Sequence, residues 1–160
     1  MEKKLRMLFI CTHNSCRSQM AEGWAKALRG QDVDAYSAGT EPTSVDPKAV
    51  QVMREAGVDI SGQTSKSLAD IAGLNFDCAV TMCGSARETC PVFPGATKVV
   101  HRGFDDPPQL ARDAATEEEA LDHYRRIRDE IKLMVMGLPD NLEKESVGPK
   151  DFILDSGEGS

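Results

Sequence analysis

Residues 5–18 read LRMLFICTHNSCRS, and this stretch decides the fold. Its first six residues form a mainly apolar run that predicts a buried strand, and the amphipathic pattern of residues 19–28 predicts a helix. The polar loop between them therefore lies at the carboxyl end of a strand and the amino end of a helix, where backbone N–H groups can converge on a tetrahedral anion. Arg17 can add a bidentate fork to the same oxyanion.

The first residue of this loop, Cys11, is the predicted nucleophile. Helix N-termini and nearby cations favour the thiolate of a cysteine over its thiol, and Arg17 supplies such a cation. Ser18 can add a hydrogen bond from its hydroxyl group to the sulfur. A buried structural cysteine near a helix cap is the alternative that these residues alone leave open.

The same residues carry a resemblance to a known family. Cys11, Arg17 and Ser18 match the Cys-x5-Arg-Ser signature of the low-molecular-weight protein tyrosine phosphatase fold. Residues 11–23 resemble still more the arsenate reductases built on that fold. His13 stands where the family often has glycine, so the loop must tolerate a side chain at that point.

Strands and helices alternate along the rest of the chain. Further strands are predicted at 33–38, 76–82 and 97–101, and further helices at 47–56, 67–71 and 117–136. This alternation predicts an α/β fold, a single three-layer domain with a four-stranded parallel sheet and helices on both faces, and the resemblance implies the same phosphatase-like architecture. We expect the domain over residues 1–138 and a flexible C-terminal extension over residues 139–160.

Length, charge and cysteine count exclude several classes of protein. A net charge of −7 provides no basic surface for nucleic acid or an anionic membrane, and no apolar stretch among the 160 residues is long enough for a secretory segment or a membrane span. Five cysteines without a signal sequence argue against a secreted disulfide scaffold, and the lack of Cys-x2-Cys pairs argues against a zinc site. We therefore expect a monomeric cytoplasmic protein without a bound metal.

A second pair of cysteines suggests redox chemistry. Cys83 follows a predicted strand and so lies at the same sheet edge as Cys11, and Cys90 is seven residues further on. Alone these are a weak signal, since both thiols could be incidental and partly buried. Beside an activated thiol they suggest a relay of thiol–disulfide exchanges. The segment also resembles the redox segment of thioredoxin-coupled arsenate reductases, with both cysteines in register, whereas Cys78 lies mid-strand and is expected in the core.

Asp106 precedes Pro107 in the loop after the last predicted strand. An aspartate in such a place is often only a turn residue. In the fold that the chain resembles, however, the carboxylate at this position is the general acid, and Asp105 is the neighbour that we do not expect to act. Phosphatases of the fold continue with aromatic residues, whereas residues 108–110 are Pro-Gln-Leu here, which favours a small inorganic oxyanion over phosphotyrosine.

The oxyanion is expected to be held by six loop residues, which are Thr12, His13, Asn14, Ser15, Cys16 and Arg17. Asn14, Ser37 and Thr64 match positions that support this loop in the family. Some members bind a monovalent cation there with the help of an aspartate, but Lys66 occupies that position in this chain. Its ammonium group could replace the cation, and a solvated surface lysine is the alternative.

Together these observations predict an arsenate reductase whose catalytic residues are Cys11, Arg17, Ser18, Cys83, Cys90 and Asp106. The Cys11 thiolate attacks arsenate, and phosphate or sulfate can occupy the same loop. No cofactor is expected, because thioredoxin, glutaredoxin or a small thiol supplies the electrons. Two rivals are a low-molecular-weight tyrosine phosphatase that uses the same Cys-x5-Arg loop, and a non-catalytic module that binds an oxyanion or a partner.

Overall fold

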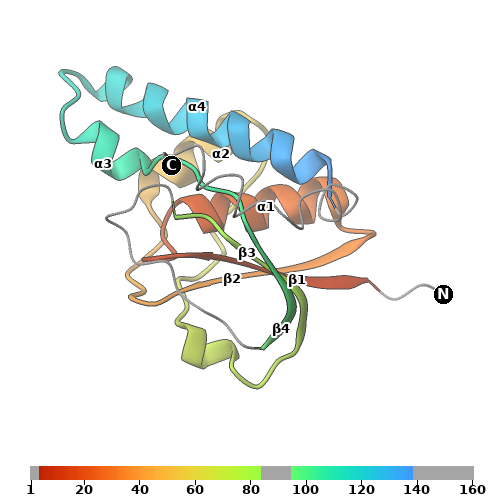
Figure 1. Cartoon of the computed structure of the whole chain (residues 1–160). Coiled ribbons are helices and arrows are strands. Elements are labelled where there is room, and N and C mark those ends of the chain that lie inside the picture. The colour runs from red at the N-terminus through yellow and green to blue at the C-terminus, as the bar shows by residue number, and fades with distance from the viewer. Residues whose placement is uncertain (1–3, 84–94, 139–160) are drawn as a thin grey trace, which may run out of the picture.

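Four parallel strands form the central sheet of the computed structural model, which describes residues 4–83 and 95–138. In chain order they are β1 (Leu5–Cys11), β2 (Val33–Gly39), β3 (Phe76–Thr81) and β4 (Ala96–His101). They lie side by side in the order β2-β1-β3-β4 (Figure 1). Because all three pairings are parallel, the carboxyl ends of the strands meet at one edge. The predicted strands are confirmed to within one residue at each end.

Strand β1 is almost wholly apolar because both of its faces are buried. Met7 and Phe9 contribute to the larger core, whereas Leu8 and Ile10 contribute to a smaller core on the other side. Alternate side chains of a strand point to opposite faces, so a strand covered on both sides needs an unbroken apolar run. The run that predicts the strand is therefore a consequence of the three-layer arrangement.

Helices cover the two faces of the sheet unequally. The helices α1 (Arg17–Arg29), α2 (Pro47–Glu55), α3 (Pro107–Ala111) and α4 (Glu117–Met136) lie on one side, and the 3-10 helix η1 (Leu68–Ile71) lies on the other (Figure 1). The larger core fills the space between the sheet and the α-helices, and η1 closes the smaller core. The predicted three-layer α/β fold is confirmed. None of the helices in the described ranges is long and apolar enough to cross a membrane.

Local signals mark the ends of α2 and α4. The Asp46 carboxylate accepts a hydrogen bond of 2.9 Å from the Lys48 N–H at the start of α2, and Gly57 follows its end with a φ of 90°. The Thr116 hydroxyl oxygen accepts from the Glu119 N–H at 3.0 Å at the start of α4. The Glu119 carboxylate bonds the N–H of residue 115 at 2.6 Å, one residue before the N–H that a capping box uses.

The structure contains a short helix, α3, that the sequence patterns do not predict. Pro107 and Pro108 occupy its first turn, where their missing N–H groups remove no helical hydrogen bond. Five residues are too few for a periodic apolar pattern, and the helix is held by its packing against α4. Its position matters because Asp106 is its N-cap residue and Arg112 is its C-cap residue.

Candidate active site

Residues 11–17, the anion loop, connect β1 to α1. The Cys11 Sγ lies 2.9 Å from the Ser18 Oγ, which in turn accepts a hydrogen bond of 2.8 Å from the Asn14 side-chain amide. A serine hydroxyl has one hydrogen and two lone pairs. Because Asn14 uses a lone pair, the hydroxyl hydrogen of Ser18 remains available for the sulfur. The contact expected between these two side chains is present.

Asn14 holds the anion loop in its shape. Its φ of 48° lies in the left-handed region, which asparagine tolerates better than most residues. Its buried Oδ1 accepts hydrogen bonds from the Lys66 N–H at 2.7 Å and from the Gln19 amide at 3.0 Å. Gln19 also donates to the Thr64 carbonyl oxygen at 2.9 Å. The bonds tie the loop to the segment before η1, which fits the supporting role predicted for Asn14 and Thr64.

The chain packs closely around the loop at Gly39, the last residue of β2. A Cβ atom at this position would lie 2.5 Å from the Thr12 carbonyl oxygen and 2.7 Å from that of Cys11. Such distances leave room for glycine alone. The exposed His13 has space for its side chain, and its Nδ1 hydrogen-bonds with the Glu41 carbonyl oxygen at 3.0 Å.

Arg17 joins three segments of the site. It is 3% exposed, and its Nη1 donates to the carbonyl oxygens of Met82 at 3.2 Å and Phe104 at 3.0 Å. Its Nη2 lies 3.7 Å from the Asp106 carboxylate. One guanidinium group therefore connects the anion loop, the end of β3 and the segment before α3.

The two neighbouring aspartates have different surroundings. Asp106 lines the cavity above the anion loop and faces Arg17. Asp105 instead forms an ion pair of 3.2 Å with Arg126 of α4. A general acid must reach the group that it protonates. The geometry therefore fits Asp106 for that role and does not fit Asp105.

A cavity of about 320 Å³ opens at the anion loop, and Cys11, Arg17 and Asp106 all line it. Of the six predicted oxyanion-binding residues, those that line the cavity are His13, Ser15, Cys16 and Arg17. The cavity meets the N-terminus of α1, where backbone N–H groups favour an anion. Within the described part of the chain, His, Cys, Asp and Glu form no group of three or more that could hold a metal ion.

Burial makes two of the cysteines poor nucleophiles. It raises the pKa of the Cys16 thiol well above its usual value, and the Asp46 carboxylate raises it further. Burial also raises the pKa of Cys78 to about 11, and this residue lies in the core as predicted. Both are neutral thiols at pH 7, and the thiolate is the reactive form. Cys11 and Cys16 both line the cavity, and Cys11 differs from Cys16 and Cys78 in having the Ser18 hydroxyl 2.9 Å from its sulfur.

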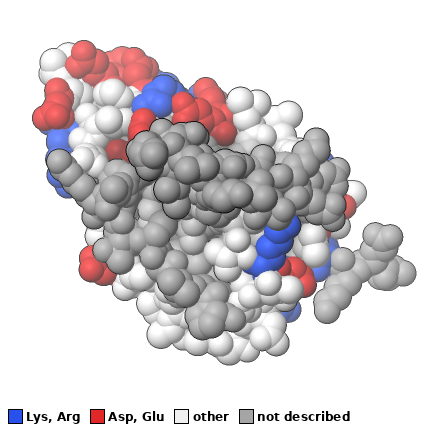
Figure 2. Space-filling view, viewed as in Figure 1, with Lys and Arg blue, Asp and Glu red and all other residues white. Residues whose placement is uncertain are grey.

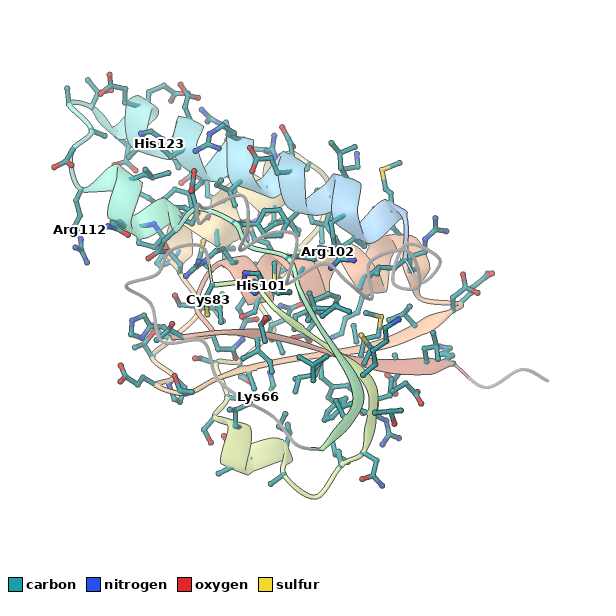
Figure 3. All side chains as sticks on the ribbon, in the orientation of Figure 1. Lys66, Cys83, His101, Arg102, Arg112 and His123 are labelled. Carbon is teal, nitrogen blue, oxygen red and sulfur yellow. The ribbon has the colours of Figure 1, made fainter. Side chains whose placement is uncertain are left out.

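Cys83 follows β3 at the same sheet edge as the anion loop. The Met82 N–H donates to the Ile10 carbonyl oxygen at 2.9 Å, so the ends of β1 and β3 lie side by side. Cys83 is buried at this edge, and Figure 3 labels it there. Cys90 lies outside the described residues, so its pairing with Cys83 stays a prediction.

A buried carboxylate, Glu22, belongs to the support of the site and is missed by the sequence reasoning. It accepts a hydrogen bond of 2.5 Å from the Ser37 hydroxyl and forms ion pairs with Lys26 at 2.5 Å and Lys66 at 3.9 Å. The Lys66 side chain is 24% exposed, so it is not a freely solvated surface lysine. The sequence signal that could have indicated Glu22 is its spacing, because it lies one helical turn after Ser18 on the same face of α1.

Tyr124 is a second residue that the sequence reasoning missed. Its hydroxyl donates to the Asp46 carboxylate at 2.6 Å, and the Asp46 N–H donates to the Ser15 carbonyl oxygen at 2.8 Å. Burial and this hydrogen bond raise the pKa of Tyr124 above its usual value. Through these contacts α4 holds the start of α2, which holds the anion loop. No local signal reveals a contact between residues 78 positions apart.

Comparisons show what this chain is similar to. The family model described as low molecular weight phosphotyrosine protein phosphatase matches residues 6–147. An arsenate reductase from Bacillus subtilis (strain 168) is 50% identical over 131 residues, which are 82% of this chain and 91% of the relative. The solved structure of an arsenate reductase in the phosphate binding state has a TM-score of 0.70 at 32% identity and covers 85% of this chain and 96% of that chain. A thioredoxin-dependent arsenate reductase from Corynebacterium glutamicum has a TM-score of 0.62 at 25% identity and covers 89% of this chain and 63% of that chain.

Proposed function

Because the chain belongs to the low-molecular-weight phosphotyrosine protein phosphatase family, we propose that it is an enzyme of the arsenate reductase branch and converts arsenate to arsenite. Relatives named arsenate reductase share about half of its residues over most of their length. The observation that carries reduction, as against hydrolysis, is the buried thiol of Cys83 at the end of β3, beside the strand that ends in Cys11. A phosphatase needs one cysteine. A reductase that gives two electrons to arsenate from its own thiols needs a second cysteine, because the two thiols become a disulfide.

The first step forms a bond between sulfur and arsenic. Arsenate binds at the N-terminus of α1, where loop N–H groups and the Arg17 guanidinium compensate its charge. The Cys11 thiolate, which accepts a hydrogen bond from Ser18, attacks the arsenic atom. Asp106 gives a proton to the oxygen that leaves as water. The adduct still contains As(V).

The second step transfers two electrons. The Cys83 thiolate attacks the sulfur of Cys11, the sulfur–arsenic bond breaks, and its electron pair stays on arsenic. Arsenite leaves as As(III), and a Cys11–Cys83 disulfide forms. Cys90 then attacks Cys83, which releases the Cys11 thiolate and leaves a Cys83–Cys90 disulfide.

An external thiol closes the cycle by reducing the Cys83–Cys90 disulfide. Thioredoxin is the donor that we propose, and glutaredoxin or a small thiol is the alternative. A cycle of this kind needs free thiols at rest, which a reducing compartment such as the cytoplasm maintains. We therefore place the enzyme in the cytoplasm.

An assay with two readouts tests the proposal. Purified protein is supplied with arsenate, thioredoxin, its reductase and NADPH, and arsenite is measured; hydrolysis of an aryl phosphate is measured in parallel. We expect Cys11→Ser to abolish both activities, because a hydroxyl is a far weaker nucleophile at neutral pH. We expect Cys83→Ser to stop repeated arsenite production and to leave the weak hydrolysis, which requires no electrons.

The matched control is Cys78→Ala, which removes the buried thiol of β3, the strand that Cys83 follows, and should keep both activities. Arsenite production by Cys83→Ser at the wild-type rate would show that the relay is wrong. Aryl phosphate hydrolysis without any arsenite from the wild-type protein would favour the phosphatase rival.

A further inference from the structure

Arg112 lies at the mouth of the cavity and lines it together with Thr43, Ser44 and Pro108. It is the C-cap residue of α3, the helix that begins directly after Asp106. Figure 3 shows Arg112 on the side of the molecule where β1 and β2 end, which is the side of the anion loop. A second arginine therefore lies outside the buried Arg17, on the route by which a ligand reaches the loop.

Within the described residues, the guanidinium group of Arg112 makes no hydrogen bond or ion pair. The arginines of the neighbouring helix α4 differ in this respect. Arg125 and Arg128 pair with Glu55 at 2.8 Å and 3.3 Å, and Arg126 pairs with Asp105 at 3.2 Å. In a chain with a net charge of −7, a guanidinium without a carboxylate partner is available to an external anion.

The surroundings of the cavity make such a cation useful. Asp46 and Asp106 line the walls. The first turn of α4 carries Glu117, Glu118 and Glu119, of which Glu117 pairs with Lys48 at 3.6 Å and Glu118 pairs with Arg125. Figure 2 shows acidic side chains gathered over this end of α4. The Asp46 and Asp106 carboxylates in the walls repel an incoming dianion, and a cation at the mouth offsets that repulsion where association begins.

We propose that Arg112 captures the oxyanion substrate at the mouth of the cavity and passes it to the anion loop. The inference rests on the proposed function, because it assumes that the loop binds an oxyanion. Arsenate carries negative charge at neutral pH, whereas arsenous acid is uncharged. Arg112 therefore attracts the substrate and has no comparable attraction for the product.

The test compares Arg112→Gln with the wild-type chain. We expect KM for arsenate to rise about five-fold with kcat changed less than two-fold, since a partly exposed charge contributes to capture and not to the bond-making steps. The dissociation constant for inorganic phosphate, measured by titration calorimetry on the reduced protein, should rise by the same factor. Added salt should weaken binding to the wild type more than to the variant. Arg112→Lys should fall between them, because it keeps the charge and loses the planar fork.

The matched control is Arg54→Gln, which removes the same charge from an arginine of α2 that is 65% exposed and pairs with Asp59 at 4.0 Å. Its phosphate affinity should change less than two-fold. The phosphate titration keeps the two proposals apart, since it reports on capture even if the protein produces no arsenite. Unchanged phosphate affinity in Arg112→Gln would overturn the inference. A rise confined to KM for the thiol donor would instead assign Arg112 to the surface that the donor contacts.

Discussion

The hydroxyl group of Ser18 lies between the Asn14 side-chain amide and the Cys11 sulfur. The Asn14 amide nitrogen donates to it, so the serine hydrogen stays available to the Cys11 sulfur. At the scale of single residues, the hydrogen bond available to the Cys11 sulfur thus depends on a contact made one step away by Asn14, which does not line the cavity.

Asp106→Asn should slow the step in which oxygen leaves by about 10²- to 10⁴-fold, which is the usual contribution of a general acid. The amide keeps the size of the side chain but has no acidic proton to give. Single-turnover measurement of water release, followed through the rate of Cys11 modification by arsenate, reports on this step.

Asp105→Asn is the control for that prediction, because the two substitutions remove the same charge from adjacent residues. Asp105 pairs with Arg126 on the surface, so its loss should change the rate less than three-fold, a small change for an exposed ion pair. A larger effect at Asp105 than at Asp106 would show that the wrong carboxylate has been assigned.

Among the elements, the end of β2 determines how closely the anion loop can approach the sheet. Gly39→Ala should reduce stability by about 1–3 kcal/mol, because the new methyl group meets two carbonyl oxygens of the loop. It should also weaken phosphate binding, since the loop must move to make room. Urea unfolding and phosphate titration measure the two effects. Gly62→Ala is the control, because a Cβ there has no atom within 4 Å, and equal losses in the two variants would contradict the steric argument.

Sequence patterns predict the elements whose signals are local. For α2, Asp46 and Pro47 mark the start and Gly57 marks the end, and the helix is found between them. The short helix α3 has no such signal, because it is held by packing against α4 rather than by its own periodicity. The resemblance placed Asp106 at the site. It did not predict α3, the helix that begins after Asp106, and therefore gave no reason to expect Arg112, its C-cap residue, at the cavity.

At the scale of the whole molecule, the site depends on contacts between segments that are distant in the sequence. Sequence patterns do not predict such contacts. Tyr124 reaches Asp46 from the other end of the chain, and Glu22 meets Ser37 on a neighbouring strand. Folding buries Tyr124, Glu22 and Ser37 and leaves Asp46 partly buried, and no local pattern marks these contacts. Glu55 is a comparable link, since Arg125 of α4 holds its carboxylate with two bonds of 2.9 Å and 2.8 Å across to α2.

The Glu55 link predicts a dependence of stability on pH. The hydrogen bonds from Arg125 lower the pKa of Glu55 below its ordinary value of 4.5. The stabilisation is therefore present above pH 4.5 and is lost as the pH falls through the lower folded-state value. Glu55→Gln should reduce the free energy of unfolding by about 0.5–1 kcal/mol at pH 7, a typical value for an exposed ion pair.

That difference should shrink as the pH falls below 4.5, which urea unfolding at a series of pH values would show. Glu130→Gln is the control, because Glu130 pairs with Arg126 one turn away on the same helix and links no second element. A difference that stayed constant down to pH 3 would mean that the Glu55 carboxylate contributes through packing rather than charge.

The carbonyl bonds of Arg17 couple two equilibria. The Arg17 guanidinium, which lines the cavity, also donates to the Phe104 carbonyl oxygen, and Asp106 follows two residues later at the start of α3. An anion bound to Arg17 would therefore act, through this hydrogen bond, on the backbone that carries the proposed proton donor. Thermodynamic linkage makes the effect reciprocal, so whatever loosens α3 must weaken anion binding by the same factor by which the anion tightens α3. Occupancy of the loop and the order of α3 would thus share one coupling free energy.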